Sequence, residues 1–280
     1  MKLLRVGPKG AEKPAILDRD GVARDVSSIV RDFSPETVSL DLVGRLKAAD
    51  ASKLRALEPK ARIGAPLSRV GHFVAIGLNY ADHAAETGAA IPAEPIIFSK
   101  APSSLSGPND DVLIPPGSKK LDWEVELAVV IGKSCDHVSE ADALGHVLGY
   151  AVCNDVSERE YQAERGGQWI KGKSAPTFGP LGPWMVTPDE VADPQALDLF
   201  LDLNGQSAQR GNTKTMIFGV AHLISYVSRF MLLEPGDVIT TGTPPGVGMG
   251  RKPQLYLKDG DRLRLGIAGL GEQNQKIVAR

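Results

Sequence analysis

Three carboxylates lie at alternate positions in the stretch Leu121–Ile131, and this spacing is the first sign of chemistry in the sequence. Polar and apolar residues alternate there, which predicts one β-strand with Asp122, Glu124 and Glu126 on the same face. That face becomes apolar in the second half of the stretch, so we expect the strand to run into the core. Carboxylates that crowd together near a buried surface need protonation, cationic partners or a metal ion.

A further carboxylate, Asp155, follows the buried strand that we predict over Val147–Cys153. A third ligand at this strand end would complete an all-oxygen site with Glu124 and Glu126. Hard carboxylate oxygens favour Mg²⁺ or Mn²⁺ over zinc, since no set of histidines or cysteines accompanies them. Taken alone, Asp155 is equally well explained as a cap for a helix over Ser157–Arg165.

His83 and Glu86 are three residues apart in a short helical segment that follows the predicted strand Phe73–Ile76 and ends at Gly88. This spacing places both side chains on one helix face. A carboxylate that orients a histidine makes it a better general base. A solvated surface pair is the commoner meaning of such a pattern, but the position after a strand end favours a site.

Other polar residues could face the same cleft. Arg159 and Gln162 are three apart on the helix predicted after Asp155. Lys171 and Lys173 lie among glycines, but the spacing excludes a phosphate-binding P-loop. The tight Gly/Pro loop over residues 241–248 has backbone amides that could hold a carboxylate.

Residues 1–66 predict a small N-terminal domain of α/β type. A strand over Leu3–Val6 precedes a hairpin at Asp20–Gly21. We expect a helix over Ser34–Ala49, which begins with a serine cap and a proline, and a second short helix over Ser52–Glu58. Nothing in this part suggests catalysis, so packing or support of a dimer is its expected role.

Residues 67–280 predict the catalytic domain, because all of the chemistry-bearing motifs fall within them. Hairpins are expected at Asn204–Gly205 and around Lys258–Asp261, with a core-facing helix over Ile217–Phe230. Many short strands with few helices indicate an α+β fold with a β-rich core.

Composition excludes several classes of protein. The 280 residues include 32 Lys and Arg against 34 Asp and Glu, so no basic field favours nucleic acid or an anionic membrane surface. No apolar run reaches the roughly 18 residues of a membrane span, and the apolar run at Met1–Pro8 is too short for a signal peptide. The two cysteines, Cys135 and Cys153, have no zinc-site spacing, which fits a reducing cytoplasm.

Several motifs follow one another in a fixed order over about residues 70–265: Gly77-Leu78-Asn79-Tyr80, Phe98-Ser99-Lys100, Asp122–Leu127, Asn154–Ser157, Lys171–Ser174 and Thr241–Gly248. Their order and joint presence resemble the fumarylacetoacetate hydrolase family. The opening of the chain is similar to a bacterial subgroup described as ureidoglycolate lyase or 2,4-diketo-3-deoxy-L-rhamnonate hydrolase.

The resemblance implies a mixed β-roll core, a homodimer and one Mg²⁺ or Mn²⁺ ion on the three carboxylates Glu124, Glu126 and Asp155. It assigns His83 and Glu86 to the activation of water, and it makes Lys173 an active-site lysine. The substrate-binding residues that it implies are Tyr80, Lys100, Arg159, Gln162 and Thr243. Asp122 is not a ligand in the family pattern and is assigned a supporting place, and Ala89–Glu94 corresponds to a lid.

The implied activity is hydrolysis of the carbon–carbon bond of a 2,4-diketo acid, either an acylpyruvate or a diketo-deoxy sugar acid. The products would be a 2-oxo acid such as pyruvate and a carboxylic acid. The alternatives are an isomerase or decarboxylase of 2-hydroxy-diene dicarboxylates or oxaloacetate, and a ureidoglycolate lyase. A metal-stabilised binding protein without activity is more remote. His83 and Glu86 favour hydrolysis, because proton transfer alone needs no attacking water.

Overall fold

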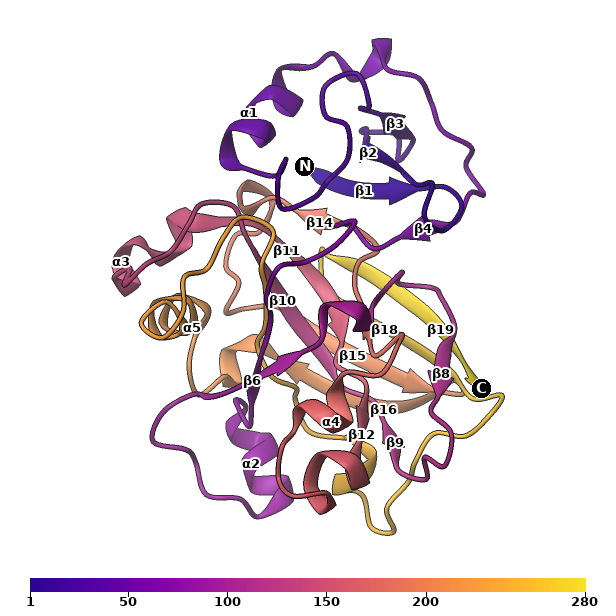
Figure 1. The fold of residues 1–280 in the computed structure, drawn as a ribbon, viewed down its shortest axis with the longest axis vertical. Coiled ribbons are helices and arrows are strands. Elements are labelled where there is room, and N and C mark those ends of the chain that lie inside the picture. Colours follow the sequence, from indigo (N-terminus) through magenta and orange to yellow (C-terminus); the bar gives the residue numbers. More distant parts are fainter.

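The computed structural model describes the backbone of residues 1–280 and the side chains of all of them except Thr87. Its largest sheet has ten strands and crosses the whole molecule (Figure 1). The strand order is β3 (Ala23–Asp25), β2 (Lys13–Leu17), β1 (Lys2–Val6), β14 (Met185–Val186), β11 (Val147–Asn154), β10 (Val125–Ile131), β17 (Val238–Thr240), β5 (Phe73–Gly77) and β6 (Ile96–Lys100), with β4 (Ile63–Gly64) paired to β1.

A second sheet has five strands and shares the main hydrophobic core with the first. Its order is β16 (Gln206–Asn212), β15 (Asp198–Leu203), β18 (Arg262–Ile267), β19 (Gly271–Ala279) and β8 (Val112–Ile114). Two short pairs join β12 (Ser157–Glu158) to β9 (Leu121–Asp122) and β13 (Gly179–Pro180) to β7 (Leu105–Ser106).

The helices are short and lie around the sheets: α1 (Leu40–Ala48), α2 (Ala81–Thr87), α3 (Glu140–Ala143), α4 (Ile170–Lys173) and α5 (Val220–Val227). Figure 1 shows α2 and α4 at the end of the molecule opposite the N-terminal elements. The fold is α+β with a strand-rich core, which confirms the predicted class. In the described part of the chain, no helix has the length and apolarity that a membrane crossing requires.

Strand β10 is buried along its whole length because each of its faces packs against a core. Val125, Leu127 and Val129 belong to the core shared with the second sheet, whereas Ala128 and Val130 belong to the core under the N-terminal elements. Buried positions on both faces explain why the second half of the predicted acidic face is apolar.

The acidic stretch is not one continuous strand, which corrects the first prediction. It breaks between β9 and β10, since the backbone amides there donate to side chains rather than to a neighbouring strand. Trp123 N–H donates to its neighbour Asp122 (2.8 Å), Glu124 N–H to Asn154 Oδ1 (3.1 Å) and Val125 N–H to Gln209 Oε1 (3.0 Å). The break leaves Glu124 outside any strand.

The N-terminal elements extend the large sheet, because β1 pairs with β14. The predicted helix over Ser34–Ala49 begins only at Leu40, where Ser39 caps it by accepting from Leu42 N–H. Ser34 instead forms an isolated turn whose carbonyl accepts from the amides of residues 37 and 38. The helix predicted over Ser52–Glu58 was also wrong, since only a 3₁₀ turn over Ala51–Lys53 forms there. The domain boundary at residue 66 stays a prediction.

Elsewhere the hairpin at Asn204–Gly205 and the end of α2 at Gly88 are confirmed, the latter with φ 67°. The helix predicted over Ser157–Arg165 is instead β12 followed by a π-helical turn over Glu160–Glu164. The strand pair expected around Lys258–Asp261 was wrong as well, because β18 pairs with β19 across a later turn.

Candidate active site

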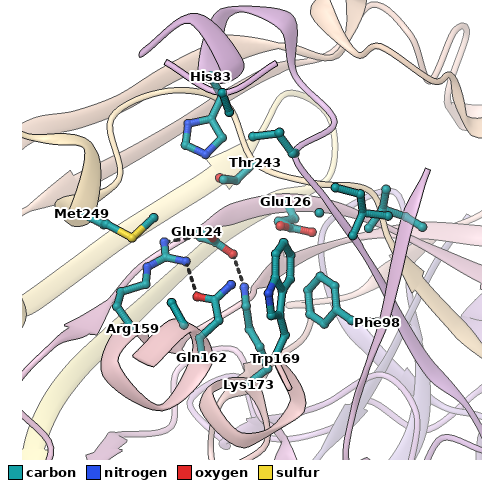
Figure 2. Close-up of a pocket in the computed structure, with 16 residues that line it drawn as sticks. His83, Phe98, Glu124, Glu126, Arg159, Gln162, Trp169, Lys173, Thr243 and Met249 are labelled. Atoms are coloured by element: carbon teal, nitrogen blue, oxygen red, sulfur yellow. Dashed lines mark hydrogen bonds and ion pairs between the residues drawn. The ribbon is translucent and has the colours of Figure 1, made fainter. Parts of the chain in front are cut away.

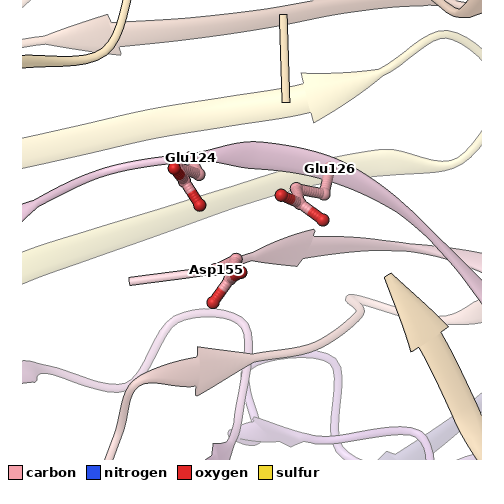
Figure 3. Close-up of side chains that lie close together, drawn as sticks. All are labelled: Glu124, Glu126 and Asp155. Atoms are coloured by element: carbon pink, nitrogen blue, oxygen red, sulfur yellow. The ribbon is translucent and has the colours of Figure 1, made fainter. Parts of the chain in front are cut away.

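Three buried carboxylates meet where β10 begins and β11 ends. The register pairs Val125 with Asn154, so Glu124 lies beside Asp155, and Asp155 N–H donates to Glu124 O (2.9 Å). Glu126 is the second residue of β10 and points to the same place (Figure 3). One oxygen from each carboxylate lies within 4.8 Å of the others, which is a spacing that one cation can bridge.

Two cationic side chains hold Glu124 from opposite sides. Lys173 Nζ lies 2.6 Å from Glu124 Oε2 and 2.8 Å from Asp155 Oδ2. Arg159 reaches Glu124 Oε1 through Nη2 (2.8 Å) and Asp122 Oδ2 through Nε (2.8 Å). Asp122 therefore supports the site indirectly, because its carboxylate helps to orient the guanidinium of Arg159 toward Glu124.

A third cation, Lys100, lies beneath Asp155. Its ammonium group is fully buried and lies 2.5 Å from Asp155 Oδ1 and 2.5 Å from the carbonyl oxygen of Lys173. Burial lowers the pKa of Lys100, and Asp155 opposes this effect. Lys100 therefore fixes the position of both Asp155 and the end of α4.

Glu126 is the carboxylate that lacks a cationic partner. Oε2 accepts from Gly242 N–H (2.9 Å), and no lysine or arginine within the described part of the chain forms an ion pair with it. Burial raises the pKa of Glu126 well above its usual range, and Asp155 and Glu124 raise it further. Burial also acts on Glu124, but Arg159 and Lys173 outweigh it and lower the pKa of Glu124 to about 2.

The local charges fit a divalent cation. Four buried carboxylates, those of Asp122, Glu124, Glu126 and Asp155, face the three cations Arg159, Lys173 and Lys100. With all seven side chains ionised, as they would be around a bound divalent ion, one negative charge remains, and it lies where Glu126 meets its neighbours. A hard divalent ion on this all-oxygen set would cancel that excess and leave one positive charge for an anionic substrate.

The Gly/Pro loop after β17 holds carboxylates through its amides, as predicted for residues 241–248, but they are the protein's own. Gly246 N–H donates to both oxygens of Glu86 (2.9 and 3.1 Å), and Gly248 N–H donates to Asp122 Oδ1 (2.7 Å). A Cβ at Gly248 would lie 1.9 Å from Leu255 O, so only glycine fits this close approach.

His83 and Glu86 form the pair that their spacing predicts. His83 Nδ1 lies 3.0 Å from Glu86 Oε2, and Glu86 is held by the loop amide. A proton on Nδ1 shared with the carboxylate makes Nε2 the basic nitrogen of the ring. Figure 2 shows His83 across the cavity from Arg159 and Gln162.

A cavity of about 310 Å³ lies between α2 and the carboxylates. Seven of its wall residues are polar: His83, Glu124, Glu126, Arg159, Gln162, Lys173 and Thr243. Arg159 Nη1 donates to Gln162 Oε1 (2.9 Å), so these two side chains do share one cleft.

Tyr80 and Lys100 are not among the residues that line this cavity, and their contacts with substrate stay a prediction. Tyr80 is fully buried, and Lys100 is directed at Asp155. Asp155 lies in the same buried layer, where one ion could reach it together with Glu124 and Glu126.

A family model described as fumarylacetoacetate (FAA) hydrolase C-terminal matches residues 72–278, and this match covers the whole site. The chain belongs to the fumarylacetoacetate hydrolase family. It is therefore an enzyme of hydrolase or isomerase type.

Solved structures of the family cover the whole chain. A fumarylacetoacetate hydrolase from Exiguobacterium antarcticum is 37% identical with a TM-score of 0.88, covering 100% of both chains. A 2-hydroxyhepta-2,4-diene-1,7-dioate isomerase from Mycobacterium marinum is 32% identical with a TM-score of 0.78, covering 100% of this chain and 99% of its own. A maleylpyruvate hydrolase from Sphingobium sp. SYK-6, in complex with manganese(II) and pyruvate, is 29% identical with a TM-score of 0.81 and the same coverage.

Within this fumarylacetoacetate hydrolase-family site, sequence reasoning missed the amide side chains that shape it. Gln209 is fully buried, accepts from Val125 N–H and donates to Thr243 Oγ1 (2.8 Å) and Pro244 O (2.7 Å). Asn154 accepts from the amide of Glu124. A glutamine within a hairpin strand carries no local signal of this role.

Proposed function

We propose that this protein is a Mg²⁺- or Mn²⁺-dependent hydrolase that cleaves the carbon–carbon bond of a 2,4-diketo acid. The products would be a 2-oxo acid such as pyruvate and a carboxylic acid. One observation carries the proposal: the His83–Glu86 pair lies across one cavity from the carboxylates Glu124 and Glu126. A base for water and a site for an ion that binds 2-oxo acids thus face the same substrate.

A divalent ion held by Glu124, Glu126 and Asp155 would act as a Lewis acid toward the oxygens of a 2-oxo acid. A hydrolase related to this chain was solved with manganese(II) and pyruvate, which supports both the ion and the product class. The all-oxygen donor set agrees with either Mg²⁺ or Mn²⁺.

His83 would take a proton from water, with Glu86 fixing the orientation of the ring. The water oxygen bonds to the carbonyl carbon C4, and the bond between C3 and C4 then breaks. Its electron pair passes to C3 and gives an enolate, which becomes the 2-oxo acid when C3 accepts a proton. Lys173 lies at the cavity wall, where its ammonium can stabilise the developing negative charge.

Isomerisation of a 2-hydroxy-diene dicarboxylate is the second candidate, because an isomerase of such a dioate is 32% identical to this chain. Decarboxylation of oxaloacetate would use similar enolate chemistry. Neither reaction needs an attacking water, so the built His83–Glu86 pair favours hydrolysis.

A substrate panel tests the reaction class. Acylpyruvates, a diketo-deoxy sugar acid, oxaloacetate and a hydroxy-diene dioate are incubated with the enzyme and Mg²⁺ or Mn²⁺, and enol absorbance, pyruvate and carbon dioxide are followed. We expect loss of enol absorbance with equimolar pyruvate from a diketo acid. Carbon dioxide release, or isomerisation without pyruvate, would select the second candidate instead.

A further inference from the structure

The cavity has two chemically different halves. The carboxylates and their cations form one end, and apart from His83, Gln162 and Thr243 the remaining wall is apolar. Six of these apolar wall residues are Ile76, Leu78, Ile96, Phe98, Trp169 and Met249. They come from β5 and the residue that follows it, β6, the segment before α4 and the loop after β17, so the apolar wall is assembled from four separate parts of the chain.

Trp169 and Phe98 form the part of this wall beside Lys173 (Figure 2). Their rings meet edge to face, with centroids 5.2 Å apart and an interplanar angle of 61°. Lys173 Nζ lies 5.0 Å from the centroid of the Phe98 ring. The aromatic pair therefore begins directly beside the charged end, within reach of the acyl group of a 2,4-diketo acid whose 2-oxo acid end occupies the charged end.

Gly77 provides the space that the indole of Trp169 occupies. A Cβ on Gly77 would lie 2.4 Å from Cζ3 and 2.9 Å from Cη2 of Trp169. Any larger residue at the end of β5 would displace the ring. The position of the tryptophan is thus built into the sheet.

The cations at the polar end are already engaged. Arg159 donates from Nε, Nη1 and Nη2 to protein oxygens, and Lys173 donates to two carboxylates. No lysine or arginine is among the described residues of the apolar wall. A second carboxylate or several hydroxyl groups on a substrate would lose hydration there without gaining a partner, which is costly.

We propose that the enzyme selects 2,4-diketo acids whose acyl group is a hydrocarbon, either a short alkyl chain or one phenyl ring, and that Trp169 is the specificity-determining residue. This inference rests on the proposed function. It excludes acyl groups that carry a second carboxylate or a polyhydroxylated chain.

A matched pair of 2-oxo acids tests the preference for hydrocarbon groups in a binding experiment that needs no turnover. 2-Oxohexanoate and 2-oxoadipate differ only in a terminal methyl or carboxylate, and calorimetry with the Mn²⁺-loaded enzyme gives both affinities. We expect 2-oxohexanoate to bind at least about tenfold more tightly. Equal affinity, or tighter binding of 2-oxoadipate, would overturn the selection.

A kinetic arm separates this inference from the proposed reaction. Butanoylpyruvate and benzoylpyruvate should be hydrolysed with kcat/KM about 10²-fold above that of fumarylpyruvate or a diketo-deoxy sugar acid. Faster hydrolysis of the polar substrates would contradict the preference for hydrocarbon acyl groups but not the proposed hydrolysis. Failure to hydrolyse any of them contradicts the proposed function, and the calorimetric pair still decides the selection.

Substitutions test whether Trp169 determines the preference for hydrocarbon groups. Trp169→Ala should weaken 2-oxohexanoate binding about tenfold and leave the affinities for Mn²⁺ and 2-oxoadipate unchanged. Gly77→Ala should act in the same direction by displacing the indole. Ile170→Ala is the matched control, because this neighbour is exposed and lies outside the cavity wall. Unchanged 2-oxohexanoate affinity in both cavity variants would rule out the role of Trp169.

Discussion

Glu126 and Glu124 are two residues apart, yet they contribute differently to the site. Glu124 is paired with Arg159 and Lys173, whereas Glu126 is held only by a backbone amide among the described contacts. The two candidate ligands therefore differ in their cationic partners before any ion is added. This difference gives opposite predictions for how the two glutamates affect the stability of the metal-free protein.

Glu126→Gln should abolish tight Mg²⁺ or Mn²⁺ binding but raise the melting temperature of the metal-free protein, because a neutral amide replaces a buried acidic group that lies beside two other carboxylates without a cationic partner. Glu124→Gln should weaken metal binding and also cost about 3–5 kcal/mol of stability, since it leaves Arg159 and Lys173 partly unpaired. Calorimetry and thermal unfolding measure both effects. Equal destabilisation by the two changes would contradict the charge balance described above.

His83→Ala should retain the fold and the metal affinity and lower kcat about 10²- to 10⁴-fold, because the base for water is lost. Steady-state hydrolysis and metal titration check the two statements separately. His222→Ala is the control, since this histidine lies on α5 and is not part of the cavity wall. Wild-type turnover in His83→Ala would remove the residue from the mechanism.

At the scale of elements, the loop after β17 connects parts of the site that lie far apart in the sequence. Its amides hold Glu126 in β10, Asp122 in β9 and Glu86 in α2. The positions of Glu126 and Asp122 and the orientation of the His83–Glu86 pair therefore depend on one short loop. Small changes in this loop should affect catalysis more than folding.

Gly250→Ala tests this coupling, because the added Cβ would lie 3.0 Å from the carboxylate of Glu86. A flexible side-chain end can move away, so we expect nearly unchanged thermal stability but a kcat lowered about 10- to 100-fold. Gly145→Ala is a suitable control, since its Cβ would meet nothing within 4 Å. Full activity with Gly250→Ala would show that the position of Glu86 is not critical.

At the scale of the whole molecule, the sequence predicted the parts of the site that lie at strand ends. Glu124, Glu126 and Asp155 could be found because these acidic residues lie within or directly beside buried strands. The break in the acidic stretch could not, since it depends on Asn154 and Gln209, which act across other strands. The burial of Tyr80 and Lys100 likewise depends on packing from the whole sheet. The homodimer stays a prediction.

Metal binding should stabilise the entire fold, because the candidate ligands lie within β10 or directly beside the ends of β10 and β11, two central strands of the large sheet. At an ion concentration of about 100 times Kd, the free energy of unfolding should rise by about 2.7 kcal/mol. Thermal unfolding with and without a chelator measures this rise. A melting temperature that does not respond to Mg²⁺ or Mn²⁺ would argue against a resident ion.

Labelled water tests most directly whether water cleaves the carbon–carbon bond of the substrate. The Mn²⁺-loaded enzyme is incubated with an acylpyruvate in H₂¹⁸O, and the released carboxylic acid is analysed by mass spectrometry. Remaining substrate is analysed in parallel to correct for exchange at its carbonyls. The predicted result is one ¹⁸O per carboxylic acid together with equimolar pyruvate. Consumption of the substrate with no labelled carboxylic acid would contradict hydrolysis.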